Sequence, residues 1–230
     1  MTFFTRYAIY YLPEPGPLAD FGARWLGWDV QAGTPAAPTE TDLPLEQLTA
    51  TPRKYGFHAT IKPPFRLPPG TTPEALAETA RALCAALAPV TLEGLCPTLL
   101  GRFLALTPEG DTAALSALAS EVVRDLDAFR APATEAELEK RRKARLSPRQ
   151  DQLLTRWGYP YVLEEFRFHM TLTGRLTPGQ AGATAAALAD LLKNVPLRPL
   201  EIRDLCLCGE DAEGRFHLVE RLPLGQGNRP

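Results

Sequence analysis

Two histidines of this chain occur in nearly identical surroundings and could act as an acid–base pair. His58 lies in the segment Gly-Phe-His-Ala-Thr-Ile, and His169 lies in Arg-Phe-His-Met-Thr-Leu. Both segments are rich in residues that favour strands, and in a strand positions i and i+2 point to the same face. Each motif therefore presents an imidazole together with a threonine hydroxyl, from Thr60 or Thr171.

These side chains suit the cleavage of a phosphodiester. Imidazole titrates at about pH 6.5, so one histidine can accept a proton while the other donates one. A threonine hydroxyl can donate a hydrogen bond to a non-bridging phosphate oxygen. Either His58 or His169 could be the base. The third histidine, His217, has no counterpart in the repeated sequence and is not assigned to catalysis.

The sequence around the motifs is itself repeated. Each motif is followed by a Thr-Pro helix start and then by two strand-like segments, and the copies cover approximately residues 54–107 and 165–223. Two such units predict an α+β fold with two pseudo-symmetric β-sheet lobes and outer helices around a central groove. We expect residues 1–230 to form one bilobal domain.

Further elements must position the motifs. The first strand is expected at 5–12, and the strand that carries the first motif at 56–65, where Pro63 and Pro64 should end it. The second motif is expected on a strand at 166–172, and residues 31–45 are expected to form a surface loop. Helices are predicted at 17–28, 73–87, 111–129, 135–145, 147–157 and 177–193, and other strands within 90–106, 200–208 and 215–222.

Composition limits the classes of function. Of the 230 residues, 45% are hydrophobic and 23% charged, which is typical of a globular protein and excludes a disordered chain. The net charge of −2 gives no strong overall attraction to nucleic acids or membranes. No apolar run is long enough to span a bilayer and the first residues do not resemble a signal peptide, so we expect a cytoplasmic protein without a membrane partner.

The chemistry predicted here needs no cofactor. The four cysteines show no Cys-x-x-Cys spacing, and reduced, buried thiols are the simplest interpretation. A zinc site that includes both motif histidines is an alternative, but the sequence has no His-Glu-x-x-His pattern. We therefore predict neither a metal nor another cofactor.

Several residues near the first motif are candidates for substrate binding. Lys62 is expected to share the strand face of His58 and Thr60. Tyr55 could stack on a base, and its neighbours Arg53 and Lys54 could bind an anion or simply form a charged surface.

Other candidates lie farther along the chain. Arg6 and Tyr10 could point towards the motifs from the neighbouring first strand. Tyr161, like Tyr159, precedes the second motif and could shape the entrance to the site. The charged stretch 135–145 could attract a polyanion, although pairing between its acidic and basic residues on a solvated helix is the more common reason for such a pattern.

The motifs and their flanks resemble a known family. His58-Ala59-Thr60-Ile61 and His169-Met170-Thr171-Leu172 are similar to the paired His-x-Thr/Ser-x motifs of the 2H phosphoesterase superfamily. The flanking segments 6–13, 54–65 and 166–174 resemble the DUF1045 family, which is described in connection with phosphonate metabolism. The resemblance covers nearly the whole chain.

This resemblance implies a bilobal, LigT-like fold with a shared groove. It also implies metal-independent phosphoesterase chemistry, usually on 2′,3′-cyclic, 1″,2″-cyclic or 2′-5′ phosphodiesters. Both motifs are intact in this chain, and the resemblance does not specify a physiological substrate.

Three functions remain open from the sequence. The first is a cyclic phosphodiesterase acting on a small nucleotide or ribose phosphate, including an intermediate of phosphonate breakdown. The second is an RNA-end-processing 2′-5′ phosphodiesterase or ligase, and the third is a non-catalytic module that binds a phosphorylated ligand. The near-neutral charge favours a small phosphorylated substrate over RNA, and the presence of both histidines favours an enzyme.

Overall fold

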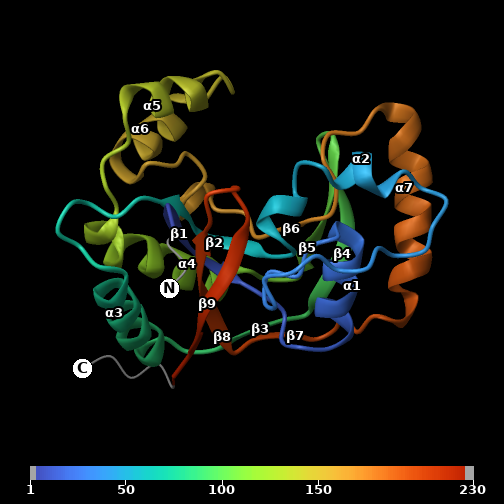
Figure 1. Ribbon diagram of the computed structural model, residues 1–230, viewed down its shortest axis with the longest axis horizontal. Coiled ribbons are helices and arrows are strands. Elements are labelled where there is room, and N and C mark those ends of the chain that lie inside the picture. Colours follow the sequence, from blue (N-terminus) through green and yellow to red (C-terminus); the bar gives the residue numbers. More distant parts are fainter. Residues whose placement is uncertain (1–3, 226–230) are drawn as a thin grey trace.

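The computed structural model describes residues 4–225, in which a seven-stranded sheet holds both motifs (Figure 1). The strand order is β4-β5-β6-β2-β1-β8-β9, and every neighbouring pair is antiparallel. A separate antiparallel pair is formed by β3 and β7. The strands are β1 (Arg6–Tyr11), β2 (Ala59–Phe65), β3 (Val90–Leu92), β4 (Gly94–Leu100), β5 (Phe103–Glu109), β6 (Met170–Thr171), β7 (Leu200–Ile202), β8 (Asp204–Glu210) and β9 (Phe216–Pro223).

Each half of the sheet combines strands from both copies of the repeat. The first motif strand, β2, lies in the same half as β8 and β9, which follow the second motif in sequence. The second motif strand, β6, lies beside β5, which follows the first motif. The halves meet where Ala59 of β2 pairs with Met170 of β6. The predicted two-lobed α+β architecture is confirmed, with the lobes joined edge to edge in one sheet.

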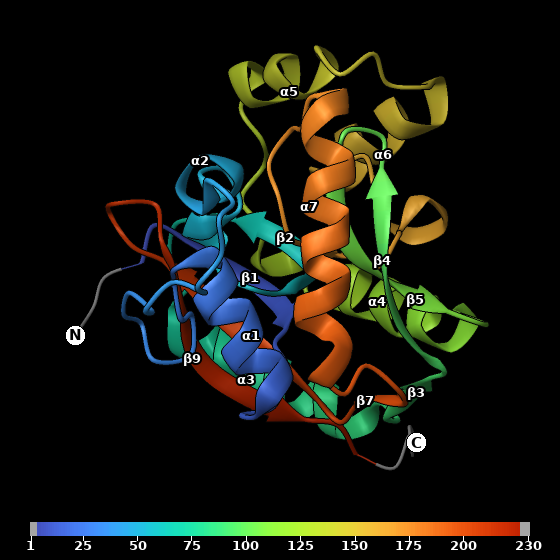
Figure 2. The same ribbon diagram turned by 90° about the vertical axis from the view of Figure 1, so that its right-hand side faces the viewer.

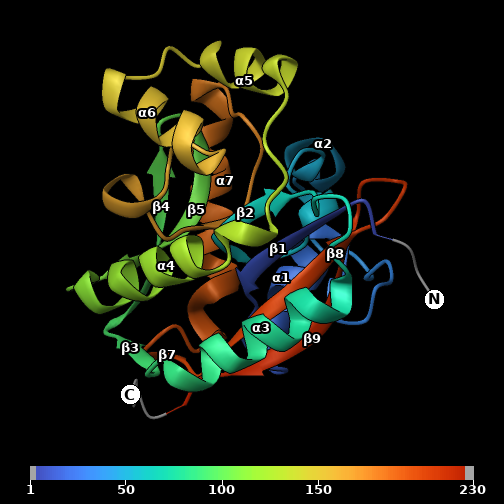
Figure 3. The same ribbon diagram turned by 90° about the vertical axis from the view of Figure 1, so that its left-hand side faces the viewer.

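Helices lie on two sides of the molecule around this sheet. Figure 2 shows α1 and α7 in front of the sheet, and Figure 3, the view from the opposite side, shows α3 and α4 in front of it. Buried apolar side chains from these four helices join those of the strands in a single core. Ala59 and Met170 belong to this core, so the motif threonines that follow them in β2 and β6 point away from it. The helices are α1 (Pro17–Leu26), α2 (Leu45–Thr49), α3 (Pro73–Ala86), α4 (Ala113–Asp125), α5 (Glu135–Arg142), α6 (Pro148–Trp157) and α7 (Pro178–Leu191), with short 3-10 turns at Arg53–Tyr55, Asp127–Phe129, Leu163–Glu165 and Leu192–Asn194.

Helices α5 and α6 lie apart from this layer and form what we call the α5–α6 cap (Figure 1). Each begins with a capping box, in Thr134 with Glu137 and in Ser147 with Gln150. Gly158 ends α6 in the left-handed conformation, with φ of 74°. In the chain, the cap lies between the two copies of the repeat.

The motif strands differ in length from the prediction. β2 continues through Pro63 and Pro64 to Phe65, so the expectation that these prolines end the strand was wrong. Proline cannot donate to a ladder, but β6 pairs with β2 only at Ala59 and leaves the rest of that edge without a partner from β6. β6 has two residues, which is shorter than the strand predicted over 166–172.

Two further sequence expectations concern the environment of the chain. In the part of the chain that the structure describes, no helix has the length and apolar character needed to cross a bilayer. All four cysteines are free thiols. Cys206 and Cys208 are buried together on one face of β8, as their spacing predicted.

Candidate active site

The two His-x-Thr motifs meet at the junction between the halves of the sheet. Ala59 and Met170, the middle residues of the two motifs, are paired across β2 and β6. Both side chains are fully buried in the core under the helices. Because neighbouring side chains in a strand alternate between faces, the residues that flank Ala59 and Met170 project towards the opposite face.

The antiparallel register then interleaves the motif residues. Continued by one residue on each side of the Ala59–Met170 pair, the register puts position 58 opposite 171 and position 60 opposite 169, so each histidine is next to the threonine of the other motif. His58 and His169 are diagonal neighbours, which in an antiparallel pair are separated by about 7–8 Å. A charge on His169 also lowers the pKa of His58, in agreement with this proximity. The spacing would allow both rings to reach one phosphate.

Hydrogen bonds orient the two imidazoles in the same way. Nδ1 of His58 lies 2.9 Å from the carbonyl oxygen of Gly56, and Nδ1 of His169 lies 2.8 Å from that of Arg167. A carbonyl oxygen only accepts, so Nδ1 is the donor in both rings and Nε2 of a neutral ring is an acceptor. His58 Nε2 lies 3.2 Å from Oγ1 of Thr60. Both histidines are thus held in the tautomer that leaves Nε2 free to exchange a proton.

Aromatic side chains enclose His58. Its ring stacks on Tyr10 with a centroid distance of 3.9 Å, and Tyr55 lies 6.2 Å away. The Phe216 ring packs against both tyrosines. Burial lowers the pKa of His58 to about 4, even though the hydrogen bond to Gly56 favours the charged form. At neutral pH the ring of His58 is therefore uncharged in the unliganded protein.

A cavity of about 280 Å³, here called the central cavity, opens over the motifs. His58, Thr60 and Thr171 contribute to its lining. A second cavity of about 500 Å³, here called the turn-side cavity, shares His58 and Thr171 and extends to Phe103 in the turn between β4 and β5. His169 is partly exposed and is in the lining of neither cavity.

The predicted substrate-binding residues are only partly gathered at this place. Arg6, Tyr10 and Tyr55 line the central cavity, and Tyr55 lines the turn-side cavity as well. Tyr161 is 43% exposed and lies outside both linings. Tyr159, which packs edge to face against Tyr161, lines the central cavity in its place.

Lys62 does not share the face of Thr60, which differs from the expectation based on spacing. Thr60 lies opposite Tyr10, whereas Lys62 lies opposite Ile9, so two steps along β2 match one step along β1. This bulge breaks the alternation of side chains. Because directly opposed residues point to the same face, Lys62 is on the core side with Ile9.

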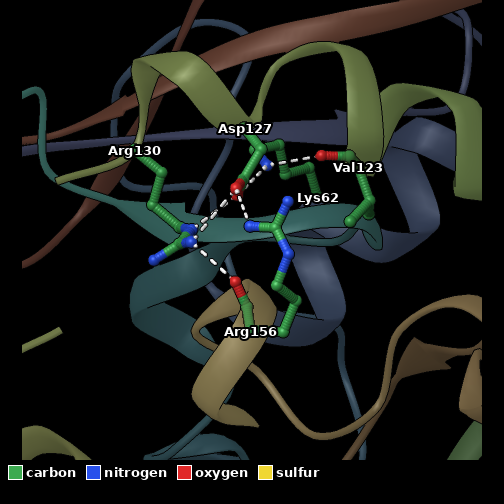
Figure 4. Close-up of polar contacts among 5 residues, drawn as sticks. All are labelled: Lys62, Val123, Asp127, Arg130 and Arg156. Carbon is green, nitrogen blue, oxygen red and sulfur yellow. Dashed lines mark hydrogen bonds and ion pairs between the residues drawn. The ribbon is translucent and has the colours of Figure 1, made fainter. Parts of the chain in front are cut away.

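The side chain of Lys62 is enclosed beneath α4, as Figure 4 shows. Its Nζ donates to the carbonyl oxygen of Val123 at 3.0 Å and lies 3.8 Å from Oδ1 of Asp127. Burial lowers the pKa of Lys62 to about 8, and Asp127 opposes that shift. Lys62 therefore joins β2 to the end of α4 and lines neither cavity.

The remaining histidine has a different environment. Nε2 of His217 lies 2.7 Å from Oδ2 of Asp211, and its ring packs edge to face on Trp28. Within residues 4–225, no three side chains of the types His, Cys, Asp or Glu are grouped as a metal site would need.

Comparison with known proteins places this chain in a family. The family model described as "Protein of unknown function (DUF1045)" matches residues 60–217. This chain belongs to the DUF1045 family.

Two relatives are named ribose 1,5-bisphosphate phosphokinase PhnN. The protein from Janthinobacterium sp. (strain Marseille) is 41% identical over 238 residues, which cover 98% of this chain and 52% of the relative. The protein from Laribacter hongkongensis (strain HLHK9) is 36% identical over 173 residues, which cover 74% of this chain and 40% of the relative. The chain spans about half the length or less of these curated relatives.

Solved structures with a related arrangement have low sequence identity. E. coli LigT complexed with 3′-AMP is 14% identical with a TM-score of 0.45, and the match covers 97% of this chain and 99% of that one. TT0787 of Thermus thermophilus is 15% identical with a TM-score of 0.43, and the match covers 97% of this chain and 100% of that one.

Arg141 lines the central cavity of this DUF1045 chain, but in the sequence it stood out only as part of the charged stretch 135–145 and not as a candidate for binding a small substrate. Arg141 reaches this cavity from α5 and lies over the ring of Tyr159, 4.6 Å from its centroid. The charged stretch around Arg141 was interpreted as a self-paired helix face. The start of this helix carries a sequence signal against such pairing for Arg141. Thr134 and Glu137 form a capping box, which engages the carboxylate at the i−4 position of Arg141.

Proposed function

We propose that this protein is a phosphoesterase that hydrolyses a cyclic phosphodiester of a small nucleotide or ribose phosphate without a metal ion. The register of β2 and β6 supports the proposal most strongly, because it interleaves His58, Thr60, His169 and Thr171 on one face. Two imidazoles and two hydroxyls supply a base, an acid and donors for the phosphate oxygens.

The reaction follows from these groups. The base takes a proton from water as the water oxygen bonds to phosphorus, and the ester bond to one ring oxygen breaks. The acid gives its proton to that leaving oxygen, so the product is a phosphomonoester with a free hydroxyl. Thr60 and Thr171 donate hydrogen bonds to the non-bridging oxygens, whose negative charge grows in the transition state.

We assign the base to His58 and the acid to His169. His58 is enclosed by aromatic rings and is neutral at pH 7, with Nε2 as an acceptor. His169 has the ring of Phe103 at 5.9 Å in place of a stacked tyrosine, and it supplies the second imidazole of the pair. A bound phosphodiester carries negative charge and would raise the pKa of His58 towards the working range of a base.

The names of the relatives indicate a metabolic setting for this activity. Ribose 1,5-bisphosphate phosphokinase implies transfer of a phosphoryl group, but this chain has no Gly-x-x-x-x-Gly-Lys-Ser/Thr sequence for holding ATP phosphates. We therefore assign the phosphokinase activity to the part of the relatives that this chain does not match. Our proposal for this chain is that it acts on a ribose phosphate in phosphonate metabolism.

The test is hydrolysis of matched substrates by the purified protein. We expect turnover of 2′,3′-cyclic nucleotides or of a 1,2-cyclic ribose phosphate, undiminished by EDTA. A 2′-5′-linked dinucleotide should be a poorer substrate, and a preference for it would favour the RNA-processing alternative. Turnover that EDTA abolishes and zinc or manganese restores would overturn the metal-free mechanism. Binding of these compounds without hydrolysis would overturn the enzymatic proposal.

A further inference from the structure

A third cavity, here called the basic cavity, adjoins the central cavity on the side of the α5–α6 cap. It has a volume of about 480 Å³, and Arg6, Tyr55, Pro64 and Arg141 line both cavities. A ligand held over the motifs could therefore extend directly into the basic cavity. The proposed reaction does not use this space.

The lining of the basic cavity is strongly positive. Among the described residues that line it, the only carboxylate is that of Glu137, and the cationic side chains are Arg6, Lys54, Arg66, Arg130, Lys140 and Arg141. Glu137 is already engaged, because it accepts from the backbone N–H of Thr134 at 2.7 Å and from Arg66 at 2.9 Å. Arg6 is paired with Glu210.

Arg130 is incompletely neutralised by its partner. Its Nε lies 2.7 Å from Oδ1 of Asp127, but the same carboxylate also lies 3.8 Å from Lys62 and 3.3 Å from Arg156 (Figure 4). One negative charge is thus shared among several positive ones. The cluster fixes the position of the Arg130 side chain and leaves the part of the cavity wall that it forms with a net positive potential.

The other three cations differ from Arg6, Arg66 and Arg130 in their partners. Within residues 4–225, Lys54, Lys140 and Arg141 form no ion pair with Asp or Glu. Lys54 lies over the ring of Tyr55, 5.1 Å from its centroid, and Arg141 packs on Tyr159. These aromatic contacts hold the cationic groups at the border of the central cavity.

We propose that the basic cavity is a second anion subsite and that the preferred substrate carries a phosphomonoester in addition to the cyclic phosphodiester. The inference rests on the proposed function, since it takes the central cavity as the place of the scissile phosphate. A terminal phosphate carries nearly two negative charges at neutral pH and accepts several hydrogen bonds. It matches a pocket of ammonium and guanidinium donors better than an uncharged hydroxyl would.

A matched pair of ligands tests this inference: adenosine 2′,3′-cyclic phosphate with and without a 5′-phosphate. Binding is measured by titration calorimetry on the His58→Ala/His169→Ala protein, so the measurement does not depend on turnover. We expect the 5′-phosphate to tighten binding by roughly 10- to 100-fold, the usual range for hydrogen bonds to charged groups. Lys54→Met/Arg141→Met in the same background should remove most of that preference.

The control is Lys143→Met, which removes one positive charge from the same stretch of sequence at an exposed position outside the cavity lining. It should keep the preference for the 5′-phosphate. Equal affinity for the two ligands, or equal losses in the control and the subsite variants, would overturn the subsite. Thermal unfolding of each variant verifies that these surface substitutions leave the fold intact.

Failure of the proposed function gives a different result. If the wild-type protein hydrolyses both cyclic ligands with the same kcat/KM and binds them equally, the subsite is wrong and the phosphoesterase proposal stands. If the wild type hydrolyses no cyclic phosphodiester but the 5′-phosphate still tightens binding through Lys54 and Arg141, the cavity is an anion site and the proposed function is wrong.

Discussion

The two His-x-Thr motifs have nearly the same sequence but different surroundings. His58 stacks on Tyr10 at 3.9 Å, and burial lowers its pKa to about 4. His169 has the ring of Phe103 at 5.9 Å, tilted by 56° and not stacked. The sheet explains this contrast, because β1 is an extra strand in the half that contains β2, and it brings Tyr10 against His58.

The contrast shows how a duplicated motif can serve two chemical roles. Both imidazoles have the same tautomer, set by a carbonyl oxygen two residues earlier in the chain. What differs is the aromatic enclosure, and at His58 the resulting desolvation favours the neutral form of the ring. A single additional strand is enough to make the two copies unequal.

The largest expected effect is the loss of either histidine. His58→Ala and His169→Ala should each lower kcat by about 10²- to 10⁴-fold, the usual contribution of general acid–base catalysis. A substrate whose leaving group needs no protonation should restore turnover to His169→Ala but not to His58→Ala. The reverse pattern would exchange the roles of the two histidines. Near-normal rates in both variants would contradict the two-histidine mechanism.

The second effect concerns the pKa of His58. A lowered pKa means that His58 stays neutral until the pH falls to about 4, so kcat/KM should fall on the acid side near that pH and not near 6.5. Tyr10→Leu removes the stacked ring and should raise the pKa of His58 towards about 6.5, with roughly tenfold lower activity at pH 5. NMR titration of the His58 ring measures the same shift without turnover. An acid limb unchanged by Tyr10→Leu would argue against this origin of the asymmetry.

A smaller effect is expected from the threonines. Thr60→Ala and Thr171→Ala each remove one neutral hydrogen bond to the phosphate and should lower kcat/KM by roughly 3- to 10-fold. Thr60→Ser and Thr171→Ser retain the hydroxyl and should recover most of that loss. Serine variants as impaired as the alanine variants would indicate that the methyl group, through packing, is what matters.

Lys62 should have the smallest effect on activity and a separate effect on stability. Its pKa of about 8 in the folded protein is below the value of about 10.4 in an unfolded chain, so the unfolded state binds the proton more tightly. Stability should therefore rise as the pH increases from about 8 to about 10.4, and Lys62→Met should remove that rise while changing kcat/KM less than about twofold. Urea unfolding of both proteins at several pH values measures this dependence of stability on pH. A large loss of activity at unchanged stability would indicate that Lys62 has a direct role in the active site.

Local patterns in the sequence predicted much of this molecule. The capping boxes at Ser147 and Thr177 begin helices where expected, because the cap and its partner are three residues apart and need no distant contact. The His-x-Thr motifs were evident for the same reason. The same local reasoning was wrong about Pro63 and Pro64, since a strand tolerates proline on an edge without a partner.

The sequence by itself determined the reactive groups, their duplication and the two-lobed α+β architecture. Only the tertiary structure decided that β2 and β6 pair with Ala59 opposite Met170, which interleaves the motifs. It also turned Lys62 into the core through a bulge and brought Arg141 from the α5–α6 cap to the central cavity. These outcomes depend on which segments far apart in the chain lie side by side. A pattern of neighbouring residues predicts strands and helices, but the solvation and partners of each side chain are set by packing between distant segments.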